Sequence, residues 1–270
     1  MELAVATPAG QVPAYAYTGG RDFDAALPCV VFVHGALNDH SVWTLLARWF
    51  AHHGHSVLAV DLPGHGRSAG APLASIEALA DWLLALLAAV GVQRAAFVGH
   101  SMGSLIALEA AVRAAERASA LVMIGTAYPM KVSEALLATA REAPLRAIDM
   151  VNAFSHSGIA AKPSYPGPGM WLHGSSRALM RRVQAGQSGL NLFHHDFSLC
   201  DGYTGGLEAA AKLQCPVSLI LGAHDQMTNP KQARVIGDAL KASVHRIDAG
   251  HSLMTEAPDA VLAALRRSLG

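Results

Sequence analysis

Apolar runs and stretches with helical spacing alternate along most of the chain. The run "PCVVFVHG" from Pro28 is rich in β-branched residues, as in strands buried on both faces. The stretch "LASIEALADWLLALLAAVG" has the periodicity of a helix and ends at Gly91, a typical helix stop. Strands are predicted at residues 2–6, 12–18, 28–35, 55–61, 94–100, 118–127, 216–223 and 243–248, and helices at 41–53, 73–91, 104–115, 230–241 and 257–268. This order predicts an α/β fold with a mostly parallel sheet and helices on both faces.

The middle of the chain breaks the alternation. Between residues 128 and 212 no clean buried strand is evident, and short helical patterns occur at about 131–155 and 175–188. The segment between them, "AKPSYPGPGMWLHG", has the proline and glycine density of a loop. We therefore expect a core domain of residues 1–127 and 213–270, with 128–212 inserted as a helical cap.

Composition and charge narrow the class of protein. The 270 residues include 20 basic and 20 acidic ones, without a basic stripe, so we expect neither nucleic acid nor a membrane surface as partner. Cys29, Cys200 and Cys215 show no metal-ligand spacing and favour a reduced compartment. The start lacks a secretory signal pattern, and the apolar run from Trp82 is too short to span a bilayer. We expect a cytoplasmic protein, and its oligomeric state stays open.

One serine stands at a predicted junction between a strand and a helix. In "AAFVGHSMGSLIALEAA", Ser101 lies between Gly99 and Gly103. A serine on such a turn is lifted clear of the sheet, and glycines two residues away relieve crowding with neighbouring backbone. The alternative is a turn serine that caps the helix. The context of strand, turn and helix favours a nucleophile.

A serine nucleophile needs a base, and the base needs an orienting acid. Asp225 and His251 each follow a predicted strand, so both are expected at the sheet edge where Ser101 lies. Asp248 is a rival for the acid, but it is only three residues before His251. The histidines at 52, 53, 55, 194 and 195 lack zinc-type spacing, so no metal site is predicted.

Backbone amides near Ser101 are candidates for an oxyanion hole. One is the amide of Met102, directly after the serine, and the other is that of Ala36, in the loop after "VVFVHG". The motif "DLPGHGRS" from Asp61 is predicted to be a structural turn beside this loop.

These motifs together resemble the α/β-hydrolase superfamily. The matching residues are "VFVHGA" (31–36), "DLPGHGRS" (61–68), "GHSMG" (99–103), "GAHD" (222–225) and "GH" (250–251). The resemblance implies an eight-stranded, mostly parallel sheet with a lid after the sixth strand. It also implies that Ser101, Asp225 and His251 act as nucleophile, acid and base, without a metal or organic cofactor. Haloalkane dehalogenases and epoxide hydrolases are set aside because they require aspartate at the position of Ser101.

The expected reaction is hydrolysis of a small to medium, largely apolar carboxylic ester through an acyl-enzyme. Alternatives on the same residues are cleavage of a carbon–carbon bond in a vinylogous diketone, and cofactor-free perhydrolase or haloperoxidase activity. A non-catalytic ligand receptor is a further alternative. Arg177, Arg181 and Arg182 are expected on a solvated face of the cap. The substrate contacts predicted from the sequence are Leu37, Phe154, Trp171, Met227 and Met254.

Overall fold

A computed structural model describes residues 1–7, 10–158, 172–186 and 190–270, and these contain an eight-stranded sheet. The strand order is β1-β2-β4-β3-β5-β6-β7-β8; β1 and β2 are antiparallel, and the strands from β4 to β8 are parallel. The strands are β1 (Glu2–Thr7), β2 (Gly10–Tyr17), β3 (Cys29–Val33), β4 (Ser56–Val60), β5 (Ala95–His100), β6 (Ala118–Ile124), β7 (Val217–Gly222) and β8 (Ser243–Ile247). The predicted fold class, a mostly parallel eight-stranded sheet, is confirmed.

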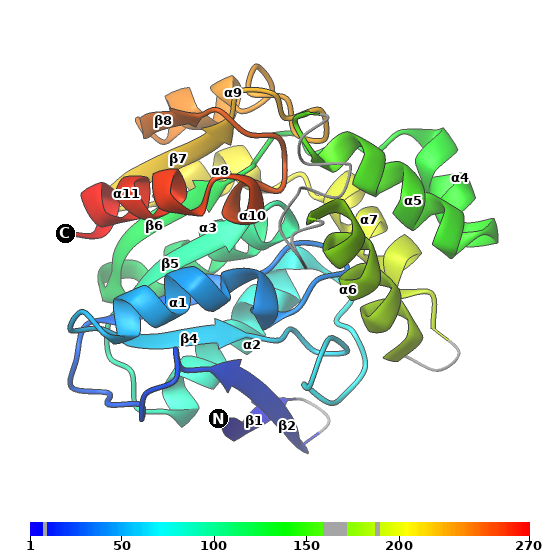
Figure 1. Ribbon diagram of the computed structural model, residues 1–270. Coiled ribbons are helices and arrows are strands. Elements are labelled where there is room, and N and C mark those ends of the chain that lie inside the picture. The colour runs from blue at the N-terminus through cyan, green and yellow to red at the C-terminus, as the bar shows by residue number, and fades with distance from the viewer. Residues whose placement is uncertain (8–9, 159–171, 187–189) are drawn as a thin grey trace.

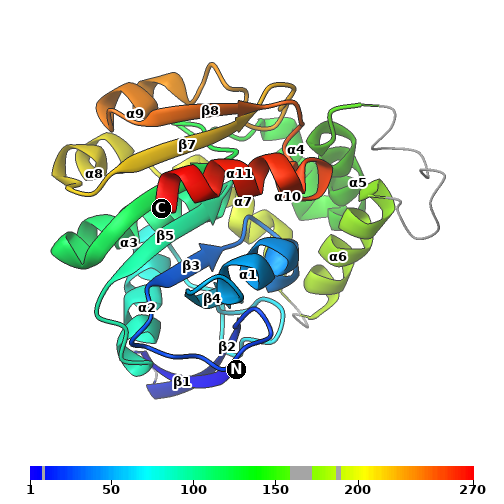
Figure 2. The same cartoon turned by 60° about the vertical axis from the view of Figure 1, so that its left-hand side comes forward.

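Helices cover both faces of the sheet (Figures 1 and 2). On one face, η1 (His40–Trp43), α1 (Thr44–Ala51), α10 (Leu253–Glu256) and α11 (Pro258–Leu269) enclose a core with Trp43, Phe50 and Leu265. On the other face lie α2 (Ile76–Ala89), α3 (Met102–Ala114), η2 (Ala115–Arg117) and α9 (Arg234–Ala239). The apolar runs that predicted buried strands are buried because helices cover both faces of the sheet.

Several element boundaries differ from the sequence-based prediction. The helix expected at 41–53 is a 3₁₀ turn followed by α1, and the helix expected at 230–241 is limited to α9. The strand expected to end at 127 ends at Ile124, because Gly125 has a φ of +53° that turns the chain.

Four helices between β6 and β7 lie together beyond the carboxyl ends of the parallel strands (Figure 1). They are α4 (Glu134–Glu142), α5 (Pro144–Ser155), α6 (Leu172–Gly186) and α7 (Leu192–Gly202), and we call them the cap helices. The next helix, α8 (Gly206–Lys212), packs instead on α3 and α9, which cover the sheet. The division into a core and a cap of residues 128–212 stays a prediction. No described helix combines the length and the apolar character needed to cross a membrane.

The turn between β5 and α3 depends on a very close approach of backbones. A Cβ atom at Gly99 would lie 2.0 Å from the carbonyl oxygen of Gly103, and one at Gly103 would lie 2.3 Å from that of Val33. Ser101 itself has a φ of 53°, in the left-handed region that non-glycine residues rarely adopt. Its amide donates to the carbonyl of Ile124 at 2.9 Å. The first turn of α3 can therefore lie directly on the ends of β3 and β5.

We expect Gly103→Ala to lower the free energy of unfolding by about 2 kcal/mol or more, because backbone atoms must move to admit the methyl group. Urea unfolding measures the change. The control is Gly202→Ala at the end of α7, where an added Cβ meets nothing within 4 Å. Equal effects of the two substitutions would contradict the packing argument.

Candidate active site

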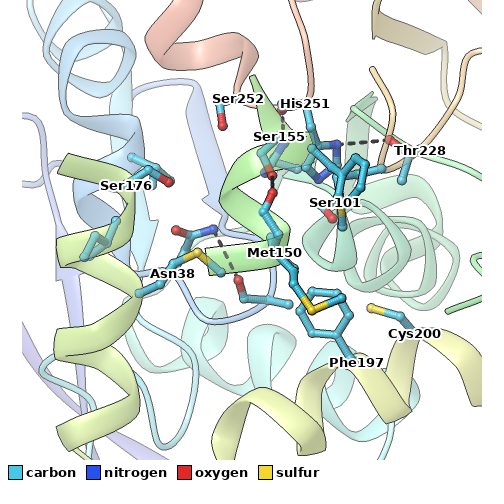
Figure 3. A pocket seen from close by; sticks show the side chains of 18 of the residues that line it. Asn38, Ser101, Met150, Ser155, Ser176, Phe197, Cys200, Thr228, His251 and Ser252 are labelled. Atoms are coloured by element: carbon cyan, nitrogen blue, oxygen red, sulfur yellow. Dashed lines mark hydrogen bonds between the residues drawn. The ribbon is translucent and has the colours of Figure 1, made fainter. Parts of the chain in front are cut away.

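The structure brings Ser101, Asp225 and His251 to one end of the sheet. Ser101 follows β5, Asp225 follows β7 and His251 follows β8, so all three lie at carboxyl ends of parallel strands. Ser101 and His251 both line a cavity of about 910 Å³ beneath the cap helices. Figure 3 shows their side chains next to each other in the cavity wall.

A buried hydrogen bond joins Asp225 and His251. The Nδ1 atom of His251 lies 2.8 Å from Oδ2 of Asp225, and the two residues are 7% and 2% exposed. The Thr228 hydroxyl donates to the same oxygen at 2.7 Å, and the Thr228 amide donates to Oδ1 at 2.8 Å. Burial raises the pKa of Asp225, but the charge of His251 and these hydrogen bonds outweigh it and hold the pKa below its usual value. An ionised Asp225 accepts a hydrogen bond from the N–H at Nδ1 of His251, which leaves Nε2 unprotonated and able to act as a base.

Thr228 was missed in the sequence analysis. Its signal is its position three residues after Asp225, where an aspartate side chain commonly accepts from the backbone of a turn. The rival acid, Asp248, lies on the surface with its Oδ1 2.8 Å from Nε2 of His224. It is therefore directed to another histidine.

His100, the residue before Ser101, holds the backbone of the loop that carries His251. Its Nε2 atom donates to the carbonyl oxygen of His251 at 2.9 Å, and the two rings lie 4.7 Å apart. Burial lowers the pKa of the His100 imidazole to about 3, and the adjacent His251 contributes to the same shift. His100 is consequently neutral near pH 7 and acts as a fixed donor.

The loop that carries His251 also has a link to the cap helices. One carboxylate oxygen of Glu256 accepts from the amide of Gly250 at 3.1 Å, and the other accepts from the amide of Ser157 at 2.9 Å. Ser157 lies two residues after the end of α5, so Glu256 joins the end of this helix to the turn that precedes His251.

Two backbone amides lie near the Ser101 side chain. Met102 begins α3, so its amide is one of the helix-terminal donors that have no partner within the helix. On the other side, Gly35 is so close that a Cβ atom there would lie 3.0 Å from the Cβ of Ser101. Ala36 follows Gly35 and lines the cavity. The geometry therefore brings both predicted oxyanion residues to the serine.

The cavity wall contains some of the predicted substrate contacts but not all of them. Phe154, Met227 and Met254 line it, as do Met130, Met150 and Phe197. Leu37 is fully buried in the hydrophobic core and does not belong to the wall, so the structure corrects this assignment. The sequence pattern marked it as apolar and close to the serine, but folding buries its side chain in the core. Trp171 lies outside the described residues.

The three arginines of α6 do not form a simple solvated face. Arg177 and Arg181 both contact Asp149 of α5. Arg182 donates from Nη2 to Oδ2 of Asp39 at 2.8 Å, and Asp39 is 3% exposed. The Arg182 side chain is 67% exposed, as expected for a solvated face, but the sequence did not predict that it also binds a buried carboxylate of the core.

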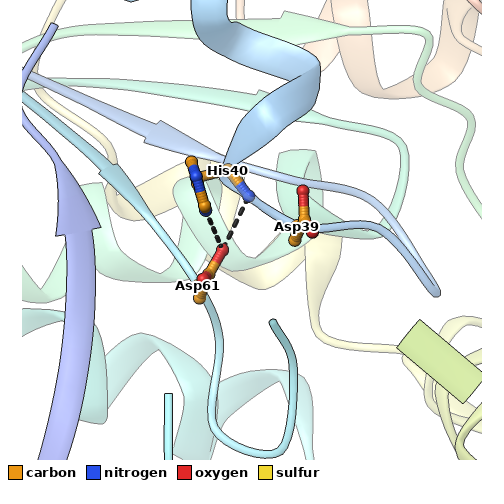
Figure 4. A group of neighbouring side chains, drawn as sticks. All are labelled: Asp39, His40 and Asp61. Atoms are coloured by element: carbon orange, nitrogen blue, oxygen red, sulfur yellow. Dashed lines mark hydrogen bonds and ion pairs between the residues drawn. The ribbon is translucent and has the colours of Figure 1, made fainter. Parts of the chain in front are cut away.

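Asp39, His40 and Asp61 form the one group of candidate metal ligands among the described residues (Figure 4). Their oxygens already accept hydrogen bonds. Asp61 accepts from the amide and Nδ1 of His40 at 2.7 and 2.8 Å and from the amide of Arg67 at 2.8 Å. Asp39 accepts from the amide of Ser41 at 2.9 Å. These contacts hold the loop after β3 against the turn after β4, as expected for a structural turn.

The depressed pKa of His100 predicts a loss of stability in acid. Between its ordinary value of 6.5 and about 3, the unfolded chain binds a proton at this residue that the folded protein does not bind. One such proton changes the free energy of unfolding by about 1.4 kcal/mol per pH unit. We expect His100→Gln, which keeps a donor toward His251, to reduce the slope of stability against pH by this amount between about pH 4 and 6. Urea unfolding at several pH values measures the slope.

The control Val98→Ala removes buried volume from the same strand. It should lower the free energy of unfolding at every pH without changing the slope. An unchanged slope in His100→Gln would refute the burial argument.

Comparison with known proteins identifies relatives of this chain. It is 36% identical over 104 residues to the sn-1-specific diacylglycerol lipase ABHD11 of Mus musculus, and the match covers 38% of this chain and 34% of the relative. The matched region thus spans about a third of that relative's length.

Solved structures share the fold over nearly the whole chain. A thermophilic esterase from Thermogutta terrifontis superimposes with a TM-score of 0.81 at 19% identity, over 99% of this chain and 96% of that one. The enol-lactonase from Burkholderia xenovorans LB400 superimposes with a TM-score of 0.77 at 23% identity, over 96% of each chain. The sequence profile of the alpha/beta hydrolase family matches residues 30–264. With this match and the eight-stranded sheet, the chain belongs to the alpha/beta hydrolase family.

Proposed function

We propose that this protein is a serine hydrolase that cleaves carboxylic esters, with Ser101 as nucleophile, His251 as base and Asp225 as the orienting acid. The observation that carries the proposal is the buried hydrogen bond of 2.8 Å from His251 to Asp225, on a histidine that shares a cavity with Ser101. A histidine oriented in this way can take the proton of a serine hydroxyl. The hydrolase family and its esterase relatives agree with this chemistry.

The proposed reaction has two halves. His251 takes the proton of Ser101 as its Oγ attacks the ester carbonyl, and the negative oxygen that develops accepts from the amides of Ala36 and Met102. His251 then gives the proton to the departing alcohol, which leaves an acyl group on Ser101. Water, activated by the same histidine, releases the acid and restores the serine. No step requires a cofactor.

The cavity favours a small to medium ester with an apolar group. Its volume of about 910 Å³ is within the range of pockets that enclose drug-sized ligands. Its cap side is largely apolar, with Met130, Leu136, Met150, Leu179 and Phe197. Lactones belong to the same substrate class, because a lactone is a cyclic carboxylic ester, and one relative is an enol-lactonase.

The decisive experiment combines a substrate panel with covalent labelling. We expect p-nitrophenyl esters and simple lactones to be hydrolysed by the wild-type protein and not by Ser101→Ala. An alkyl fluorophosphonate should add one mass increment to the peptide that contains Ser101. Asp225→Asn should remain folded but lose about four orders of magnitude in kcat, because the imidazole then loses its orienting carboxylate.

Other results would redirect the proposal. Labelling that persists in Ser101→Ala would reject this nucleophile. Turnover of a vinylogous diketone without turnover of esters would favour carbon–carbon bond cleavage, and bromination that depends on peroxide would favour a perhydrolase. Tight ligand binding without turnover would favour a receptor.

Met150, in α5, is expected to help select the length of the ester chain. It lines the cavity, and Figure 3 shows it between the serine side and Phe197. Since one methylene in an apolar pocket is worth about 1–3 kcal/mol, Met150→Ala should shift the ratio of kcat/KM between octanoyl and acetyl esters by about tenfold. The matched control is Leu145→Ala, on the exposed side of the same helix, where Leu145 is 51% exposed. A change of equal size in both variants would show that α5 acts through stability and not through contact with substrate.

A further inference from the structure

A buried carboxylate from the cap helices reaches the loop that follows β3. Oδ2 of Asp196, in α7, accepts from the amide of Leu37 at 2.8 Å. The same oxygen lies 2.9 Å from Nε2 of His65, in the turn that follows β4. The Asp196 and His65 side chains are only 1% and 2% exposed. Three segments that are far apart in sequence therefore meet at one oxygen atom.

His65 has the hydrogen-bond pattern of a charged imidazole. Its Nε2 faces the Asp196 carboxylate, and its Nδ1 lies 3.1 Å from the carbonyl oxygen of Pro63. Both neighbours are acceptors, so both ring nitrogens must carry protons. Burial lowers the pKa of His65, but the charge of Asp196 and these hydrogen bonds outweigh it and raise the pKa above its usual value. Asp196 and His65 are thus a buried ion pair.

The loop that this pair holds adopts a strained conformation. Leu37 has a φ of 55°, in the left-handed region that non-glycine residues rarely adopt. The Asp196 oxygen uses the Leu37 amide, so this amide is not available to the cavity. Ala36, one residue earlier, lines the cavity together with Ser101, and its amide is the proposed oxyanion donor. The two peptide groups share the Cα atom of Ala36, and an anchor on one restricts the orientation of the other.

A second cap side chain binds the same loop. Arg182 of α6 donates to Asp39 at 2.8 Å, two residues after Leu37. The segment 36–39 is therefore held from α6 and from α7. Asp196 is the tighter anchor, because it is buried and contacts the backbone itself, whereas the Arg182 side chain is 67% exposed.

Stability alone is a weak reason for such a pair. A buried ion pair is often no more stable than apolar side chains of similar size, because both charges lose their hydration. A carboxylate that accepts from one specific amide, by contrast, determines the direction of that amide. From this geometry we propose that Asp196, held by His65, is a positioning residue that sets the Ala36 amide of the oxyanion hole. The inference rests on the proposed function of Ser101.

The test compares Asp196→Ala, which removes the accepting oxygens, with a control directly after the cap helices. The control is Tyr203→Phe, which removes the buried hydrogen bond of 2.5 Å from Tyr203, just after α7, to Glu109 in α3. Both variants remove buried polar contacts between this part of the chain and the core, but only the first acts on the segment 36–39. The substrate is p-nitrophenyl butyrate.

Three measurements separate positioning from docking of the cap helices. The first is the division of the effect between kcat and KM. The second is inhibition by phenylboronic acid, whose serine adduct carries a tetrahedral oxygen into the oxyanion hole. The third is inhibition by 1-hexanol, which occupies an apolar cavity without such an adduct.

In Asp196→Ala, kcat and the affinity for phenylboronic acid should both fall by about tenfold to a hundredfold, because a donor displaced by about 1 Å loses most of its contribution. KM and the affinity for 1-hexanol should stay within about twofold, since ground-state binding does not use the oxyanion donor. Tyr203→Phe should leave all four quantities within about twofold. Unchanged kcat and boronate affinity in Asp196→Ala would overturn the inference, as would an equal loss of affinity for 1-hexanol.

Amide hydrogen exchange gives a readout that is independent of turnover. The Leu37 amide should exchange slowly in the wild-type protein and at least about tenfold faster in Asp196→Ala, but not in Tyr203→Phe. Rapid exchange of this amide in the wild-type protein would overturn the anchor even if Asp196→Ala failed to fold. A wild-type protein that cleaves no ester would refute the proposed function instead, so the two failures are distinguishable.

Discussion

The close approach of the first turn of α3 to the ends of β3 and β5 is the constraint on which the site depends. It requires hydrogen in place of a side chain at Gly99 and Gly103, where a Cβ atom would lie 2.0 and 2.3 Å from carbonyl oxygens. With that contact made, Ser101 projects from a turn with a φ of 53°, and the free amides of the helix point to the same place. Gly35 extends the contact to the loop after β3. Backbone packing thus arranges Ser101, the helix terminus and the loop of the proposed oxyanion hole, independently of the hydrogen bonds between side chains.

Polar contacts between the cap helices and the core gather at the loops around the cavity. Asp196 binds the amide of Leu37, Arg182 binds Asp39, and Glu256 joins the His251 loop to the end of α5. Apolar packing alone would hold the cap in place without specifying the direction of a single amide. Directional contacts at these loops link the position of the cap helices to the orientation of the proposed catalytic groups.

The buried histidines around Ser101 show how the surroundings of a side chain select its charge. His34 and His100 each face a backbone group and another histidine, and burial lowers their pKa values to about 4 and about 3. His65 is equally buried, yet the carboxylate of Asp196 raises its pKa. A neutral donor beside His251 and a charged partner for Asp196 therefore come from the same residue type.

The sequence by itself determined which segments form the mostly parallel sheet and where the proposed catalytic side chains lie. The alternation of apolar runs and helical patterns predicted the positions of the strands along the chain, because a strand buried on both faces must be apolar throughout. The residues Ser101, Asp225 and His251 were predicted because each follows such a strand, and the carboxyl ends of parallel strands lie at one edge of the sheet.

Only the tertiary structure decided which side chains hold these groups in place. Asp196 meets Leu37 across 159 positions, and Arg182 meets Asp39 across 143. No local pattern encodes a contact of that range, since it depends on where the cap helices pack. For the same reason Leu37, which is apolar and near the serine in sequence, belongs to the core and not to the cavity.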